Sequence, residues 1–296
     1  MDTIELAKVG NYTVEKKYNL TYEAFAEKHL FANYPVVLGD ACKDWKAKEK
    51  FTTQFFKEKY GDREVWIEGK TFKLADYIDL METANEDNPA PYPCKLQIDR
   101  NYPELIPDVS PRFKYAMPDW CHSKLMPKKF LGHADTLEIF FGSPGGMFPY
   151  VHYDYLCLHA YITQIQGYKE FTVIPPHQTE FVYPVKENLW VSEIPNIYNI
   201  DYEKFPKAKQ LTPITFTVGP GETLFIPCGW WHTAKSLTPT ISIAQDSLNQ
   251  SNFDQFQKEV EMSLNKRSSF KSKLAKIYLN KMIRLMKTLD KKGIRV

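Results

Sequence analysis

Three side chains that can hold a divalent metal lie in two short segments of the sequence. The segment VHYDY contains His152 and Asp154 at positions i and i+2. On a β-strand this spacing points both side chains to one face, where they can share an ion. His232, in CGWWHTA, follows a strand-like stretch and can complete the set. Two imidazoles and one carboxylate leave positions open on Fe(II) for a co-substrate and O2.

An alternative reading of these residues is structural, because an HxD pair occurs by chance and a histidine is more often structural than a ligand. The other five histidines lack a carboxylate two residues away on a strand, and most fall in segments whose sequence is typical of helices or loops. They are His29, His122, His133, His159 and His177. We therefore predict that His152, Asp154 and His232 are the metal ligands and the catalytic centre.

Lys169 is the candidate for binding an anion near that centre. It lies in QIQGYKEFTVIPP, a strand-like segment that follows the HxD region. A lysine that points into a barrel is costly to bury unless an anion pairs with it, and a keto-acid co-substrate chelating iron leaves such a carboxylate. The alternative is that Lys169 faces solvent, and the local sequence leaves both open.

The elements that must position these residues are short strands separated by turns, from about Thr136 to Asp246. They read LEIFFG, AYITQIQG, KEFTVIPP, ITFTVGPGE, TLFIPCG and TISIAQD. Short strands at regular spacing indicate a β-sandwich or barrel. The Pro-Gly turn in VGPGETLFIP predicts a hairpin corner of a jelly roll. We predict a mainly β protein with a jelly-roll catalytic core at residues 136–250.

Two flanking regions complete the predicted organisation. Residues 1–135 form an α/β lead-in, in which FTTQFFKEKYG predicts a helix capped by Thr52 and ended at Gly61, followed by the strand EVWIEG. Residues 83–135 are rich in Pro, Asn and Asp, which predicts loops that can build a cleft. Residues 251–296 are helical, with one apolar stripe at spacings of three and four: Phe270, Leu274, Ile277, Tyr278, Met282, Leu285, Met286 and Leu289.

Charge is unevenly distributed along the chain. The net charge is +2, yet residues 266–296 hold 11 bases and one acid, which leaves 27 bases and 35 acids elsewhere. The basic helix either covers the core or forms a dimer with solvated lysines, or it is a patch for nucleic acid, an anionic membrane or an acidic substrate. We expect the first, a homodimer through the C-terminal helices, and expect no nucleic-acid partner.

Composition limits the class of protein. Apolar residues make up 43% and charged residues 25%, as in an ordinary globular protein. The N-terminus lacks the apolar core of a signal peptide, and no later run is long enough to span a membrane. The five cysteines include no CxxC pair, so neither a disulfide framework nor a zinc knot is expected. These features predict a cytoplasmic protein with free thiols.

Taken together, HYDYLCLHAYITQIQGYKEFTVIPP, DYEKFP, VGPGETLFIPCGWWH and SIAQD resemble the JmjC and cupin-like hydroxylases, over most of residues 14–250. The resemblance implies an Fe(II)- and 2-oxoglutarate-dependent dioxygenase on a double-stranded β-helix. It also implies that His152, Asp154 and His232 bind iron and that Lys169 binds the 2-oxoglutarate carboxylate. Some segments are similar to the lysyl hydroxylase branch and others to the asparaginyl branch.

The sequence departs from the family pattern at three positions that bear on the co-substrate site. Pro149 stands where the family usually has a threonine hydroxyl, Ile162 where an inner polar residue is usual, and Asp246 where an asparagine is usual. We predict that Ile162 and Asp246 nevertheless lie at the cofactor-binding site. These changes leave the iron ligands intact and bear on 2-oxoglutarate affinity and on the choice of substrate.

Three functions follow from these observations. The first is hydroxylation of an unactivated C–H bond in a protein or peptide side chain. The second is hydroxylation of a small molecule or natural product, and the third is binding by a cupin without catalysis. Histone demethylation is not expected, because the sequence shows no reader module or nuclear localisation cluster.

Overall fold

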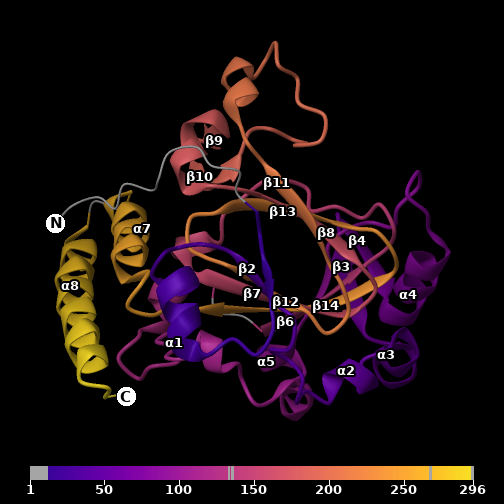
Figure 1. Ribbon diagram of the computed structural model, residues 1–296, viewed down its shortest axis with the longest axis horizontal. Coiled ribbons are helices and arrows are strands. Elements are labelled where there is room, and N and C mark those ends of the chain that lie inside the picture. Colours follow the sequence, from indigo (N-terminus) through magenta and orange to yellow (C-terminus); the bar gives the residue numbers. More distant parts are fainter. Residues whose placement is uncertain (1–12, 133, 135–136, 267–268, 295–296) are drawn as a thin grey trace.

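Two β-sheets form the centre of the molecule (Figure 1). The computed structural model describes residues 13–132, 134, 137–266 and 269–294. The large sheet has seven strands in the order β1 (Lys16–Lys17), β2 (Val36–Leu38), β12 (Thr223–Ile226), β7 (His159–Gln166), β14 (Thr240–Ser247), β6 (Leu137–Gly142) and β5 (Cys94–Gln97). The second sheet has three strands in the order β11 (Ile214–Val218), β8 (Lys169–Ile174) and β13 (Trp231–Ser236). Apart from β1 and β2, all pairs in the two sheets are antiparallel.

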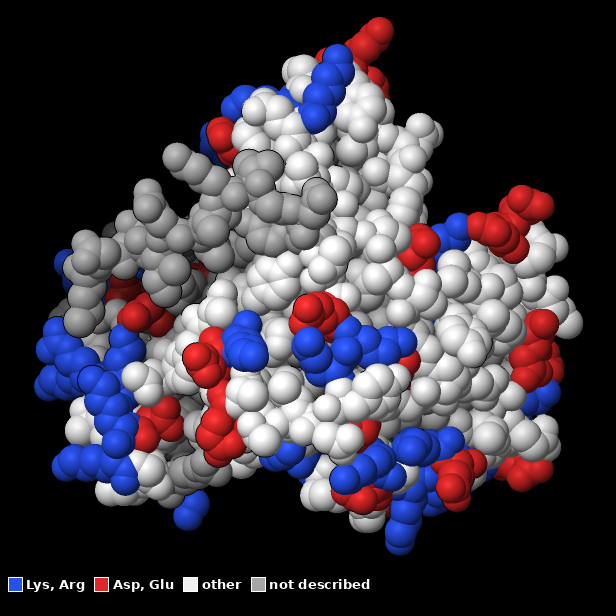
Figure 2. Space-filling model, in the orientation of Figure 1, with Lys and Arg blue, Asp and Glu red and all other residues white. Residues whose placement is uncertain are grey.

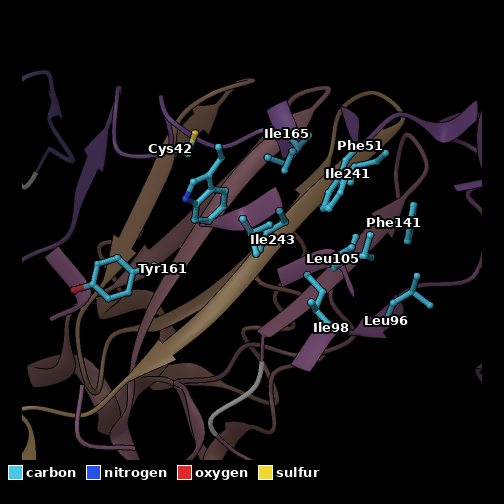
Figure 3. Close-up of a cluster of buried hydrophobic side chains, with 14 of the residues drawn as sticks. Cys42, Phe51, Leu96, Ile98, Leu105, Phe141, Tyr161, Ile165, Ile241 and Ile243 are labelled. Carbon is cyan, nitrogen blue, oxygen red and sulfur yellow. The ribbon is translucent and has the colours of Figure 1, made fainter. Parts of the chain in front are cut away.

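Side chains of the large sheet alternate between a core and a cavity, as the two-residue period of a strand requires. On one face, Tyr161 and Ile165 of β7 and Ile243 of β14 join the largest apolar cluster (Figure 3). On the other face, Ile162 of β7 and Ala244 of β14 line a cavity toward the second sheet. The packed face therefore stabilises the sheet, and the opposite face is available for polar side chains.

Helices and smaller strands surround the sheets. The α-helices are α1 (Tyr22–Phe25), α2 (Ala47–Lys50), α3 (Thr53–Tyr60), α4 (Leu74–Thr83), α5 (Ile98–Asn101), α6 (Lys128–Leu131), α7 (Phe253–Asn265) and α8 (Phe270–Lys291). A π-helix, η1 (Ala26–Leu30), continues α1, and the 3₁₀ helices are η2 (Pro103–Val109), η3 (Lys114–Ala116), η4 (Tyr155–Cys157), η5 (Pro176–Phe181) and η6 (Pro206–Gln210). Two hairpins pair β3 (Glu64–Ile67) with β4 (Lys70–Lys73) and β9 (Pro184–Val185) with β10 (Asn188–Ser192). Within the described residues, no helix is both long and apolar enough to cross a bilayer.

Several predicted elements are confirmed. Helix α3 begins after Thr52, whose hydroxyl accepts a hydrogen bond from the Phe55 amide, and ends at Gly61. All six strand segments predicted between residues 136 and 246 are strands, and the five cysteines are free and buried. The division of the chain at residues 136 and 251 stays a prediction, although β2 and β5 of the lead-in are strands of the large sheet.

The predicted hairpin in VGPGETLFIP is wrong. Strand β11 pairs with β8 in the three-stranded sheet, whereas β12 pairs with β2 and β7 in the large sheet. Gly221, at φ +83°, adopts a left-handed conformation that glycine takes without strain. The turn therefore carries the chain from one sheet to the other instead of folding it back on its neighbour.

The C-terminal region is helical, as predicted. It folds as two helices, α7 and α8, which share an apolar cluster and lie side by side (Figure 1). The predicted stripe on α8 is divided between two faces. Met282 and Met286 are buried, whereas the other face exposes Phe270, Leu274, Ile277, Tyr278 and Leu285. Lysines and arginines gather on the same part of the surface (Figure 2).

Candidate metal centre

Two backbone hydrogen bonds hold His152 and His232 opposite each other. The His152 amide donates to the His232 carbonyl at 3.0 Å, and the His232 amide donates to the His152 carbonyl at 2.6 Å. His232 belongs to β13, whereas His152 makes isolated bridges to β13 and β10 and lies outside the named strands. The prediction that VHYDY is a regular strand is therefore wrong. The pairing still places the two imidazoles together, with ring centroids 4.4 Å apart.

Asp154 joins the two histidines. Its backbone is extended, at φ −63° and ψ 133°, and its carboxylate oxygen lies 3.9 Å from Nε2 of His232. One ligand atom from each of His152, Asp154 and His232 lies within 4.8 Å of the others. Two nitrogen donors and one carboxylate oxygen at this spacing fit a divalent metal such as Fe(II), with further positions open.

The histidine tautomers are set by the backbone. Nδ1 of His232 lies 3.0 Å from the Trp230 carbonyl, and Nδ1 of His152 lies 3.4 Å from the Tyr150 carbonyl. A carbonyl can only accept, so Nδ1 carries the proton and Nε2 keeps its lone pair for a metal. Burial, then the nearby His232, hold the pKa of His152 well below its usual value, while burial raises the pKa of Asp154. The imidazole of His152 is thus held neutral and ready to coordinate.

Lys169 points into the protein and not to solvent. Its side chain is 2% exposed, and Nζ donates to the Ser242 hydroxyl at 2.9 Å and to the Tyr92 hydroxyl at 3.3 Å. In the part of the chain that the structure describes, no carboxylate forms an ion pair with it, and burial lowers the pKa of Lys169 to about 7. A desolvated ammonium held only by neutral hydroxyls is a favourable partner for an anion.

One cavity of about 450 Å³ contains all these groups. The predicted ligands and Lys169 line it, as do Ile162 and Asp246, two of the three positions at which a departure from the family pattern is expected. Pro149 is exposed and does not line it. His133 and Asp135 also have the HxD spacing, and both lie outside the described residues. The sequence thus predicted residues that the fold brings together; their chemical roles stay a prediction.

Other residues of the cavity were missed. Ser242 stands four residues before Asp246 on β14, so strand periodicity from Asp246 could have found it. Tyr92 comes from the Pro-rich loops, for which only a cleft was predicted. Trp190 and Tyr150 form an aromatic wall, with ring centroids 6.5 and 5.3 Å from that of His152. Nothing in the local sequence marked Trp190, because the β9–β10 hairpin brings it to the site.

Comparison with known proteins gives a family match over most of the chain. A model of the cupin-like domain family matches residues 22–255. Lysine-specific demethylase JMJ21 of Arabidopsis thaliana is 27% identical over 257 residues, covering 82% of this chain and 26% of the relative. Lysine-specific demethylase JMJ30 of the same plant is 28% identical over 252 residues, covering 78% and 54%.

A third relative carries two activities in its name. The bifunctional arginine demethylase and lysyl-hydroxylase psr-1 of Caenorhabditis elegans is 24% identical over 242 residues, covering 77% of this chain and 59% of the relative. The chain thus spans from about a quarter to just under three fifths of the length of these relatives.

The lowered pKa of Lys169 gives a testable dependence of stability on pH. Between pH 7 and the ordinary value of 10.5, the unfolded chain holds a proton on Lys169 that the folded protein has released. Raising the pH through this window therefore stabilises the fold, by at most about 1.4 kcal/mol per pH unit, and below pH 7 the contribution is constant. Urea unfolding of the native protein and of Lys169→Met, both without metal, isolates the contribution of Lys169 to the free energy of unfolding. The difference in stability should rise above pH 7; a flat difference contradicts the pKa shift.

Proposed function

This chain belongs to the cupin-like domain family, and we propose that it is an Fe(II)- and 2-oxoglutarate-dependent dioxygenase that hydroxylates a side chain of a protein or peptide. One observation carries the proposal. The same cavity contains a His–Asp–His ligand set and the buried ammonium of Lys169, which has no carboxylate partner among the described residues. A metal and a dianionic keto acid together fit both groups. In the same proposal, the two sheets around the cavity are the halves of a double-stranded β-helix.

Different residues of the cavity would bind the metal and the co-substrate. His152, Asp154 and His232 would hold Fe(II) on one face. The Lys169 ammonium would bind the distal carboxylate, with the hydroxyls of Tyr92 and Ser242 beside it in place of the threonine that Pro149 replaces. When bound, Fe(II) supplies the activation of O2 that couples oxidation of 2-oxoglutarate to succinate and CO2 with hydroxylation of substrate.

The aromatic wall would shield the reacting group from water. Phe148 stacks on the His152 ring at 4.6 Å between centroids, and Tyr150 and Trp190 stand edge-on to that ring. Excluding water from the site limits side reactions of an oxidising centre. The cavity therefore offers binding and protection, and no protein nucleophile or general base is required.

The names of the relatives support a protein substrate. Two of them are named for demethylation of lysine, and psr-1 for demethylation of arginine and hydroxylation of lysine. Demethylation is the case in which the hydroxylated carbon is an N-methyl group, so the proposal includes it, although the sequence alone gave it no support. Hydroxylation of a small molecule is the second candidate, because Ile162 and Asp246 change the lining of the cavity.

The exposed face of α8 supports a homodimer. Phe270, Leu274 and Ile277 are 75%, 51% and 54% exposed, and Leu285 is 45% exposed. Each such side chain contributes roughly 1.5–3 kcal/mol when fully buried, whereas an exposed lysine contributes much less after screening by salt. We propose that this face pairs with a second copy.

Substitution of any one ligand tests the metal centre. His152→Ala, Asp154→Ala and His232→Ala should each abolish Fe(II)-dependent succinate formation, because each removes a third of the protein's ligands. Circular dichroism should show an intact fold. The matched control, His177→Ala, changes an exposed histidine outside the cavity and should keep full turnover. Full activity in any of the three ligand variants contradicts the assignment.

Substitution of Lys169 tests the anion site. Lys169→Ala should raise the KM for 2-oxoglutarate by roughly 10- to 100-fold, since a hydrogen bond to a charged group contributes about 1.5–3 kcal/mol. Lys169→Arg should be partly active, because a planar guanidinium replaces a compact ammonium poorly. Lys235→Ala is the control. It removes a lysine of the neighbouring strand β13, whose ammonium forms an ion pair with Glu86. An unchanged KM in Lys169→Ala would show that another cation binds the co-substrate.

Light scattering tests the dimer. Leu274→Glu combined with Ile277→Glu should convert a dimer into a soluble monomer at both low and high salt, because the change leaves the buried face of α8 intact. Truncation after Arg267 should instead give a poorly soluble protein, because it also removes Leu279 and Met282, which are buried in the core. A native protein that is monomeric contradicts the dimer. A truncated protein that stays soluble and loses only salt-sensitive binding to a polyanion contradicts it as well.

A further inference from the structure

A second, smaller cavity adjoins the metal-site cavity. It lies between the β9–β10 hairpin and α7, has a volume of about 160 Å³, and shares two walls, Tyr155 and Trp190, with the larger one. We propose that this groove binds the polypeptide segment next to the reacting residue, with an apolar side chain against Leu189 and Met262. The inference rests on the proposed function and names its substrate as an extended chain.

The floor of the groove is apolar and accessible. Leu189 of β10 is 39% exposed, Met262 of α7 is 40% exposed, and Tyr155 is 37% exposed. Two neighbouring polar groups already have partners: Lys266 Nζ donates to the Glu187 carbonyl at 2.8 Å, and Glu259 accepts from the Tyr153 hydroxyl at 2.7 Å. Leu189 and Met262 therefore offer apolar contact within a rim that also contains Lys186, Asn188 and Ser263. The bond from Lys266 joins the two sides of the groove.

The spacing of the two cavities fits a peptide. The Trp190 ring lies 6.5 Å from the His152 ring on one side and 5.7 Å from the Tyr155 ring on the other, measured between centroids. An extended chain advances about 3.3 Å per residue, so a residue in the groove is within about four positions of one beside the metal ligands. A small substrate held within the larger cavity would leave the groove without a role.

The walls that the two cavities share indicate what occupies the groove. A groove that shares its walls with the reaction cavity is placed to read the residues flanking the reacting one, and specificity follows from pockets for alternate side chains of an extended peptide. A second copy of the chain has a larger exposed apolar face on α8, which the groove does not include. The flanking segment of the substrate is the occupant that we infer.

A set of peptide libraries tests the inference. Each library has one amino acid fixed at the central position and randomised residues on both sides of it. After incubation with Fe(II), 2-oxoglutarate and O2, mass spectrometry reads the added oxygen or lost methyl group and the flanking preferences. The native protein should favour apolar residues at one position, within about four residues of the modified residue. Leu189→Lys with Met262→Lys should change that preference to acidic residues, by roughly tenfold, and leave the preferred central residue unchanged.

A matched control separates the groove from general surface effects. Leu80→Lys with Ile106→Lys changes two apolar residues of the same exposure, 39% each, outside both cavities, and should leave the preference unaltered. The inference is overturned if the groove variant keeps the native preference, if it merely turns a dimer into a monomer, or if 2-oxoglutarate is consumed and no peptide is modified. Absence of any 2-oxoglutarate turnover in the native protein overturns the proposed function itself.

Discussion

The reciprocal backbone pairing of His152 with His232 is the constraint on which the rest of the site depends. Strand β13 is in turn paired with β8, in a register that sets Ser236 opposite Lys169 and His232 opposite Val173. His232 and Ser236 are separated by an even number of residues, so the metal side and the anion side share one face of the sheet. A slip of one residue between β8 and β13 would turn His232 away from the cavity. The register of this pair therefore fixes both ends of the site at once.

A polar cavity of this kind is tolerable because stability comes from the opposite face. Burying the Lys169 ammonium opposes folding, as its lowered pKa shows. The neighbouring residues of the large sheet, such as Tyr161 and Ile243, are wholly buried on the other face, within the largest apolar cluster. Strand alternation thus lets the same strands carry a dry core and a reactive surface. The residues that line the cavity, such as Ile162 and Asp246, can therefore change without removing a contact from that core.

Local patterns predicted the residues whose signal lies within a few positions. The HxD spacing, the cap at Thr52 and the strand segments need only near neighbours, and the fold bears them out apart from the regular strand at His152. Three features depend on partners far along the chain. The turn at Gly221 connects two sheets, Trp190 reaches the metal side on a separate hairpin, and the apolar residues of α8 divide between a buried and an exposed face. No local pattern records which partner an apolar or turn residue meets.

Helix α7 links the metal ligands to the groove. After Asp154 the chain must turn sharply into β7, and it does so through Leu156 and Cys157, at φ +61° and +52°. Two consecutive left-handed residues without glycine are strained, and such strain persists only where the surroundings hold it. Asn252, the buried cap residue of α7, supplies that hold by donating to the Cys157 carbonyl at 2.9 Å. About two turns further along this helix stands Glu259, and about three turns further stands Met262; both line the groove. A shift of α7 would therefore alter the groove and the support of Asp154 together.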